Sequence, residues 1–209
     1  MKNLKYLTIS ILPLMWSVYF LFEILTGRVK DLPTIIGNIA LIILFALVGF
    51  YFYKLSQKYP QGFKCKTIII IFSILMVIDQ GIKLIIKFFF FEDYIDIIKG
   101  FLSFNPIINT DGSWLNARFS TGISFPLLIF VNFIAIVLFF ELYRYYLSKG
   151  NNSFYGDMCF LFIFSGSLCS LIDKIFYGGS LDFIGISNLF IADIKDIYGS
   201  EERRVGKEC

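Results

Sequence analysis

Four aspartates near the end of the chain are the residues best suited to chemistry. Asp173, Asp182, Asp193 and Asp196 fall within residues 165–198, a stretch that begins inside an apolar run. A carboxylate next to lipid is costly, so acids at the end of a membrane helix are expected to have a function. Two carboxylates held close together cannot both ionise easily, and such a pair offers one base and one acid at neutral pH. The spacing therefore favours a pair of acids that activates water against an amide.

The composition excludes several other chemistries. The 209-residue chain has no histidine, which excludes Ser-His and Cys-His catalysis and removes the commonest zinc ligand. The four cysteines show no CxxC spacing, so neither a disulfide framework nor a metal cluster is expected. The net charge of +3 lies in connections between apolar runs, where it reports on membrane topology rather than nucleic-acid binding. The sequence therefore predicts no metal, no cofactor and no nucleic-acid partner.

Long apolar runs must position these acids. The chain is 57% hydrophobic and 17% charged, with a mean hydropathy of +0.73. Runs of about 20 residues are long enough to cross a bilayer as helices. Five such runs are present, at residues 6–25, 34–53, 67–91, 121–146 and 154–176. The sequence predicts an all-α polytopic membrane protein, with a polar loop at 92–120 and a short extended element around Asp182.

Lysines and arginines between the runs predict the orientation. Cytoplasmic connections are rich in these residues, and the basic stretches here are 54–66 and 144–149. Alternating runs then place the N-terminus in the cytoplasm. The loop 92–120 and the stretch after the fifth run lie outside, so the acids lie near the extracytoplasmic face. Arg28 and Lys30 fall on the unfavourable side of this arrangement.

Two pairs of polar residues lie inside the apolar runs. Asp79 and Lys83 are four residues apart in the third run, so they share a helix face and can pair. Ser170 and Asp173 are three apart near the end of the fifth run and face the same way. Two interpretations stay open for these residues: pairs and caps that fix helix packing, or support for a site near the membrane surface.

Four motifs in order make residues 68–198 resemble signal peptidase II, the lipoprotein signal peptidase. Asp79–Lys83 matches the family's D-Q-x-x-K, and Asn109–Trp114 is similar to its N-x-G-x-x-F loop with an insertion. Ser170–Lys174 falls where the family has N-x-x-D-R, and Leu181–Phe183 where it has V-D-F. The shared order of the motifs carries the resemblance.

The resemblance implies a bacterial cell-membrane endopeptidase with four transmembrane helices and two catalytic aspartates. It implies cleavage just before a diacylglyceryl-modified cysteine, with prolipoprotein signal peptides and membrane lipid as partners. Asp173 is expected to be one catalytic residue. The last family motif, F-N-x-A-D, fits in two registers. We prefer the register that makes Asp196 the second catalytic residue; the other makes it Asp193 and puts Phe190 at a polar position.

Other polar residues are expected to support the pair or bind the peptide, with Trp114 in the outer loop over the substrate. They are Asp79, Lys83, Asn109, Trp114, Ser170, Lys174 and Asp182. Ser170 replaces the family's asparagine. Lys174 replaces its arginine, so the positive charge is kept but the bidentate hydrogen bonding of a guanidinium group is lost. Two other functions therefore stay open: a non-catalytic binding or assembly protein of the same fold, or a small transporter subunit with a polar path.

The sequence also predicts a division into three parts. Residues 1–66 form a two-helix extension outside the family core, and 67–198 form that core. Residues 199–209 resemble the translation of a sequencing adapter, and the family's last helix is not found before them. We expect the chain as written to be inactive without that helix, even where the parent enzyme is active.

Overall fold

A computed structural model of the chain describes residues 2–110, 123–187 and 189–198. Within these residues, five helices are long and apolar enough to span a membrane, as the sequence predicts. They are α1 (Lys2–Leu25), α2 (Leu32–Lys58), α3 (Cys65–Ile85) with its π-helical continuation η1 (Ile86–Phe90), α5 (Phe125–Ser148) and α6 (Phe154–Phe176). The protein is thus mostly helical and polytopic.

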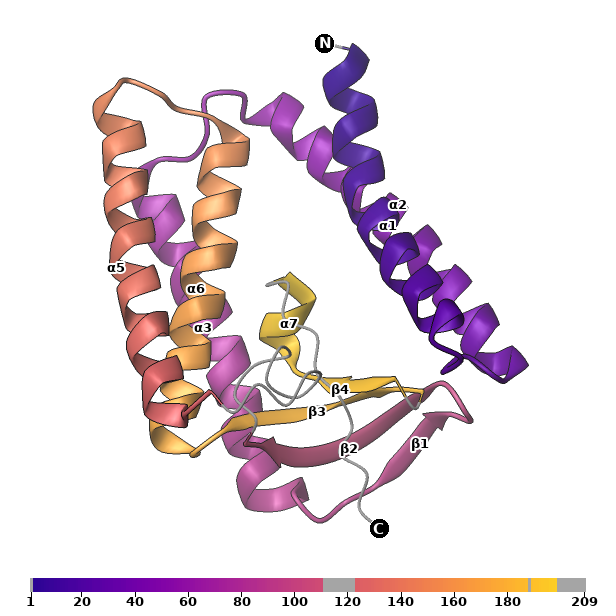
Figure 1. Ribbon diagram of the computed structural model, residues 1–209. Helices are drawn as coiled ribbons and strands as arrows, with labels where there is room; N and C mark the ends of the chain where they lie inside the picture. Colours follow the sequence, from indigo (N-terminus) through magenta and orange to yellow (C-terminus); the bar gives the residue numbers. More distant parts are fainter. Residues whose placement is uncertain (1, 111–122, 188, 199–209) are drawn as a thin grey trace.

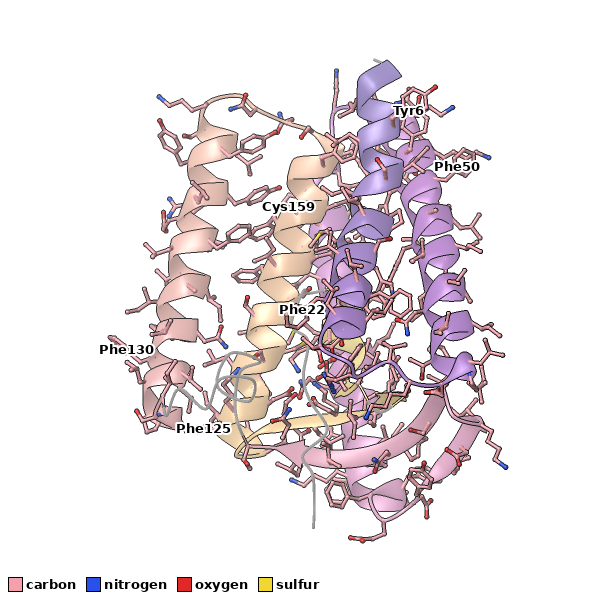
Figure 2. All side chains as sticks on the ribbon, turned by 45° about the vertical axis from the view of Figure 1, so that its right-hand side comes forward. Tyr6, Phe22, Phe50, Phe125, Phe130 and Cys159 are labelled. Atoms are coloured by element: carbon pink, nitrogen blue, oxygen red, sulfur yellow. The ribbon has the colours of Figure 1, made fainter. Side chains whose placement is uncertain are left out.

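Apolar side chains cover the outer faces of the helices. Phe130 on α5 is 60% exposed, and Val77 on α3 is 70% exposed. Figure 2 shows the labelled Phe130 and Phe50 on the outside of their helices. Exposed apolar area on this scale is unfavourable in water, so these faces are suited to contact with lipid.

A four-stranded antiparallel sheet closes one end of the helices (Figure 1). Its order is β1-β2-β3-β4, made of β1 (Ile95–Ile98), β2 (Leu102–Asn109), β3 (Ser180–Ile186) and β4 (Phe190–Ala192). β3 confirms the extended element expected around Asp182, whereas β1 and β2 were not predicted within the polar loop. The sheet joins the polar loop and the stretch after the fifth apolar run, which we expected on the same side of the membrane. That this side is the extracytoplasmic one stays a prediction.

Two glycines turn the chain from α6 into β3. Gly178 has φ +68°, a left-handed conformation that glycine adopts without strain. A Cβ on Gly179 would lie 2.5 Å from the carbonyl oxygen of Asn109, so β2 and β3 approach too closely there for a side chain. Beyond the turn, the buried Leu181 and Phe183 pack on Ile86 at the end of the third spanning helix. The turn therefore brings Asp182 back over the helix ends.

The first two helices form an antiparallel hairpin that ends on the same sheet (Figure 1). Trp16 Nε1 donates to Asn38 Oδ1 at 3.1 Å across the hairpin. Arg28, unfavourably placed by the positive-inside rule, bonds the buried carboxylate of Glu23 at 2.9 Å. Its charge is therefore balanced locally, which explains how an arginine is accommodated at this end of the helices.

Close packing of the hairpin depends on Gly49. A Cβ there would lie 2.8 Å from the carbonyl oxygen of Thr8, whereas a Cβ on Gly81 of α3 meets nothing within 4 Å. We expect Gly49→Ala to lower the free energy of unfolding by about 1–3 kcal/mol through overpacking. Gly81→Ala is the matched control and should be neutral or stabilising. Thermal unfolding in detergent checks this, and equal midpoints for the two variants would contradict the packing described.

Candidate active site

The acids singled out from the sequence converge on one buried lysine. Lys83 is fully buried, and its Nζ lies 3.0 Å from Asp79 Oδ2, 2.6 Å from Asp173 Oδ2 and 2.5 Å from Asp193 Oδ2. The pairing of Asp79 with Lys83 expected from their spacing is confirmed. A single ammonium group thus ties together α3, α6 and the segment that follows β4.

A second lysine, Lys195, enters the same cluster from α7 (Ile194–Tyr198). It is 2% exposed, and its Nζ donates to Asp193 Oδ2 and, at 2.7 Å, to Ser180 Oγ. Its backbone N–H donates to Asp79 Oδ1 at 3.1 Å. The sequence analysis singled out neither Lys195 nor Ser180. The available signal was a lysine set between two aspartates directly after a buried apolar strand.

Asp173 has both carboxylate oxygens engaged. Oδ1 accepts from Gln80 Nε2 at 3.0 Å, while Oδ2 accepts from Lys83 and from Ser180 Oγ at 3.3 Å. Ser180 Oγ also lies 3.3 Å from Asp193 Oδ2. Lys195 Nζ lies 3.3 Å from Asp173 Oδ2 as well, so Asp173 and Asp193 share three neighbours: Lys83, Ser180 and Lys195.

The sheet brings Asp182 alongside the acids that follow β4. One carboxylate oxygen from each of Asp182, Asp193 and Asp196 lies within 4.8 Å of the others. Asp182 is fully buried, and its Oδ2 accepts from Asn109 Nδ2 at 3.1 Å. The antiparallel pairing of β3 with β4 produces this approach, because it sets residue 184 opposite residue 192.

Asp193 and Asp196 hold each other's backbone at the start of α7. The Asp196 N–H donates to Asp193 Oδ1 at 3.1 Å, and the Asp193 N–H donates to Asp196 Oδ2 at 3.1 Å. This reciprocal arrangement has the form of a capping box. It orients the Asp193 carboxylate so that Oδ1 faces the helix while Oδ2 faces the lysines.

The two lysines set the charge of Asp193. Burial by itself raises the pKa of this carboxyl group, but the nearby charges of Lys195 and Lys83 outweigh it and hold the pKa well below its ordinary value. Asp193 is thus ionised at neutral pH. Only the ionised form of this carboxyl group can accept a proton from water.

The remaining expected residues lie at several places. Asn109 contacts Asp182, as described above. Ser170 and Lys174 are both buried on α6, and the Lys174 ammonium donates to Ser170 Oγ one turn earlier. Trp114 lies outside the described residues. The structure therefore brings the expected acids, Lys83 and Asn109 together.

Residues 70–198 match the protein family described as Signal peptidase (SPase) II. The chain belongs to the signal peptidase II family. The match covers every aspartate of the cluster together with Lys83 and Lys195. It begins after the α1–α2 hairpin, so these two helices precede the matched part of this signal peptidase II chain.

Two solved structures share the fold. Each is described as a bacterial membrane enzyme determined by the in meso method, one at 2.3 Å and one at 1.9 Å resolution. Both are 22% identical to this chain and cover 68% of it; the matches span 85% and 90% of those chains, with TM-scores of 0.50 and 0.51. A search of curated proteins finds no match. At this identity the structures establish the fold alone.

Removal of the Lys83 charge should destabilise the fold. Lys83→Met would leave Asp79, Asp173 and Asp193 buried with less compensating charge, and breaking a buried ion pair costs about 3–5 kcal/mol. The depressed pKa of Asp193 contributes stability above the ordinary carboxyl pKa, and this contribution is lost as the pH falls towards its folded value. The gap in unfolding midpoint between parent and variant should therefore narrow on acidification.

Thermal unfolding in detergent at neutral and acidic pH checks this prediction. Lys64→Met, at the start of α3 and outside the cluster, is the control and should unfold like the parent. A Lys83→Met midpoint equal to that of the control at neutral pH would contradict the role given to this ion cluster.

Proposed function

We propose that this protein is an aspartic endopeptidase of the bacterial cell membrane that removes signal peptides from lipid-modified prolipoproteins. Membership of the signal peptidase II family supports a peptidase. The observation that carries the proposal is the buried approach of Asp182 to Asp193, whose carboxylate oxygens lie within 4.8 Å of each other. Paired carboxylates at this distance can divide the roles of base and acid.

The geometry supports Asp182 and Asp193 as the catalytic pair, in place of the Asp173 and Asp196 preferred from the sequence. Asp173 is bonded by Gln80 and Lys83 of α3, which suits an anchor between helices, whereas Asp182 approaches Asp193 from β3. Asp196 bonds the backbone of the chain at the start of α7, which suits a structural cap. Of the two registers left open for the last motif, the one ending at Asp193 is the better supported.

The charges of the cluster assign the roles of the two acids. Among the described residues, the five aspartates of the cluster, at positions 79, 173, 182, 193 and 196, outnumber the two lysines that bond them, Lys83 and Lys195. Like charges at close range favour protonation of one acid. Because two lysines hold Asp193 ionised, the proton is assigned to Asp182. Asp193 is then the base and Asp182 the acid.

These roles give a balanced hydrolysis of an amide. Asp193 takes a proton from a water molecule while the oxygen of that water attacks the scissile carbonyl carbon. Asp182 donates its proton to the carbonyl oxygen. As the tetrahedral intermediate collapses, the proton on Asp193 passes to the leaving nitrogen and the C–N bond breaks. The new carboxyl group then returns a proton to Asp182. Ser180 and Lys195 keep Asp193 Oδ2 oriented throughout.

The position of the site supports a membrane-anchored substrate. The cluster lies where the spanning helices meet the sheet (Figure 1), close to the exposed apolar faces of those helices. A peptide next to a lipid-modified cysteine can reach this level while its acyl chains stay in the bilayer. We assign this end of the helices to the extracytoplasmic side, with the N-terminus in the cytoplasm.

Single aspartate variants separate the possible pairs. We expect Asp182→Asn and Asp193→Asn each to lower the cleavage rate at least about a thousandfold, because removal of a group that transfers a proton or activates water is worth factors of this order. Asp196→Asn should stay within about tenfold of the parent, since an amide can still cap the helix. The complete gene is expressed in a host without its own lipoprotein signal peptidase, and prolipoprotein processing is followed by gel shift.

Two results would contradict this assignment. An inactive Asp196→Asn beside an active Asp182→Asn would restore the pair preferred from the sequence. A parent protein that inserts into the membrane but leaves every tested prolipoprotein uncut would favour the non-catalytic alternative. Immunoblots of the membrane fraction are the control for equal amounts of each variant.

Lys195 should set the acid limb of the pH profile. Lys195→Met removes a positive charge beside Asp193, so the pKa of that carboxyl group rises and a higher pH is needed to ionise the base. We expect the acid limb of kcat/KM to move to higher pH, whereas Lys195→Arg, which keeps the charge, should move it less. The measurement is cleavage of a purified prolipoprotein across a pH series. Superimposable acid limbs for the methionine variant and the parent would contradict the role of Lys195.

A further inference from the structure

The α1–α2 hairpin, residues 2–58, bonds the segment that leads into Asp193. Arg28 Nη2 donates to the carbonyl oxygen of Leu189 at 2.5 Å. Thr34 Oγ1 and Ser187 Oγ are hydrogen-bonded at 2.5 Å. Arg28 lies in the connection between α1 and α2, and Thr34 lies in the first turn of α2. The turn of the hairpin therefore contacts the connection between β3 and β4.

Aromatic packing adds to these polar bonds. The ring of Phe190 is 6.0 Å from that of Trp16 and 5.9 Å from that of Tyr19, centroid to centroid, with edge-on geometry in both pairs. Phe190 is 5% exposed, and it lies in one apolar cluster with Leu189 and Ala192. Phe190 and Ala192, which lie just before Asp193, thus belong to an apolar cluster against which Trp16 and Tyr19 of α1 pack.

β4 needs such support because of its place in the sheet. It has three residues, lies at the edge, and pairs with β3 through Ile184↔Ala192, Gly185↔Ile191 and Ile186↔Phe190. A short edge strand has few ladder bonds to hold it. The hairpin supplies side-chain contacts to this strand and a hydrogen bond to the carbonyl oxygen of the residue before it. Asp193 follows the last residue of the strand, so its position depends on how firmly β4 is held.

The polar groups of the hairpin are arranged for this contact. Glu23 is 1% exposed and accepts from Arg28 Nη1 at 3.0 and 2.9 Å, which leaves Nη2 directed at Leu189. Asp31 accepts from Thr34 N–H at 3.1 Å and so caps α2 at the residue that bonds Ser187. A buried acid at the lipid-facing end of a helix is costly. Here it orients the arginine that bonds the β3–β4 connection.

We propose that the α1–α2 hairpin is a positioning element for Asp193 and acts through Phe190. This inference rests on the proposed function. It also accounts for the aromatic residue at a position where the resembled motif F-N-x-A-D has asparagine. In this chain the ring of Phe190 packs against both Trp16 and Tyr19, so the hairpin and the apolar residue form one unit. The hairpin thereby orients the base without contacting substrate or reacting atoms.

A positioning role predicts a loss in kcat with little change in KM. We expect Trp16→Ala and Phe190→Asn each to lower kcat by about tenfold to a hundredfold, since small misplacements of a catalytic group cost rate on this scale. KM should stay within about twofold of the parent value. Phe190→Leu, which keeps an apolar side chain, should recover most of the lost rate. Leu14→Ala is the matched control, because Leu14 is on the same helix and 63% exposed to the lipid side.

These kinetics are measured on the protein from the complete gene with a purified prolipoprotein. Equal kcat values for Trp16→Ala and Leu14→Ala would overturn the proposal. A rise in KM at unchanged kcat would also overturn it, because the hairpin would then bind substrate rather than position the base. Membrane insertion and thermal unfolding of each variant identify loss of fold. If Trp16→Ala does not fold, the kcat of Phe190→Leu is compared with that of Phe190→Asn, and equal values for these two variants would overturn the proposal.

A cross-link tests the contact without relying on activity. In a background with the native cysteines replaced by alanine, Thr34→Cys and Ser187→Cys should form a disulfide on oxidation, because the parent hydroxyl oxygens are 2.5 Å apart. The cross-linked protein should cleave at the parent rate. Absence of the cross-link, or its formation with loss of cleavage, would overturn the proposal. If the cross-link forms in the double-cysteine variant but the parent protein itself cuts no prolipoprotein, the proposed function is overturned instead, and the catalytic role of the hairpin with it.

Discussion

The burial of Lys83 is the constraint on which the rest of the structure depends. An ammonium group with no access to water is tolerated only when carboxylates surround it. Asp79 comes from the same helix, but Asp173 and Asp193 come from α6 and from beyond β4, 90 and 110 positions away in the chain. The helices and sheet must therefore close together before the lysine is satisfied. The site and the fold are stabilised by the same charges.

The same constraint makes the acids unequal. Asp173 has its oxygens committed to Gln80, Lys83 and Ser180, whereas Asp182 approaches Asp193 from a strand and accepts from Asn109. A symmetric pair of aspartates would share one proton without preference. Two lysines beside one acid break that symmetry, because the charged form of Asp193 is stabilised and the proton is left to a neighbour. The position of Lys195 in the cluster thus has a chemical consequence.

Much of the architecture could be predicted from the sequence, since apolar runs of sufficient length leave few alternatives to membrane helices. The pairing of Asp79 with Lys83 follows from helical spacing and is local. The contacts of Lys195 and Ser180 could not be predicted, because they depend on the antiparallel pairing of β2 with β3, whose partners are 71–84 positions apart in the chain, and of β3 with β4. The register of the last motif stayed open for the same reason, because the surroundings of Asp193 and Asp196 depend on how the sheet brings β3 beside β4.

Phe190 shows how a residue that weakens a family resemblance can become informative once its neighbours are known. From the sequence it counts against the register that ends at Asp193, because a ring replaces a polar group. In the structure the ring is buried against Trp16 and Tyr19, which lie outside the part of the chain that matches the family. A polar side chain there would bury an amide among aromatic rings at a cost in free energy. The departure and the two preceding helices therefore require each other, which argues that the hairpin belongs to the working site rather than to a separate membrane anchor.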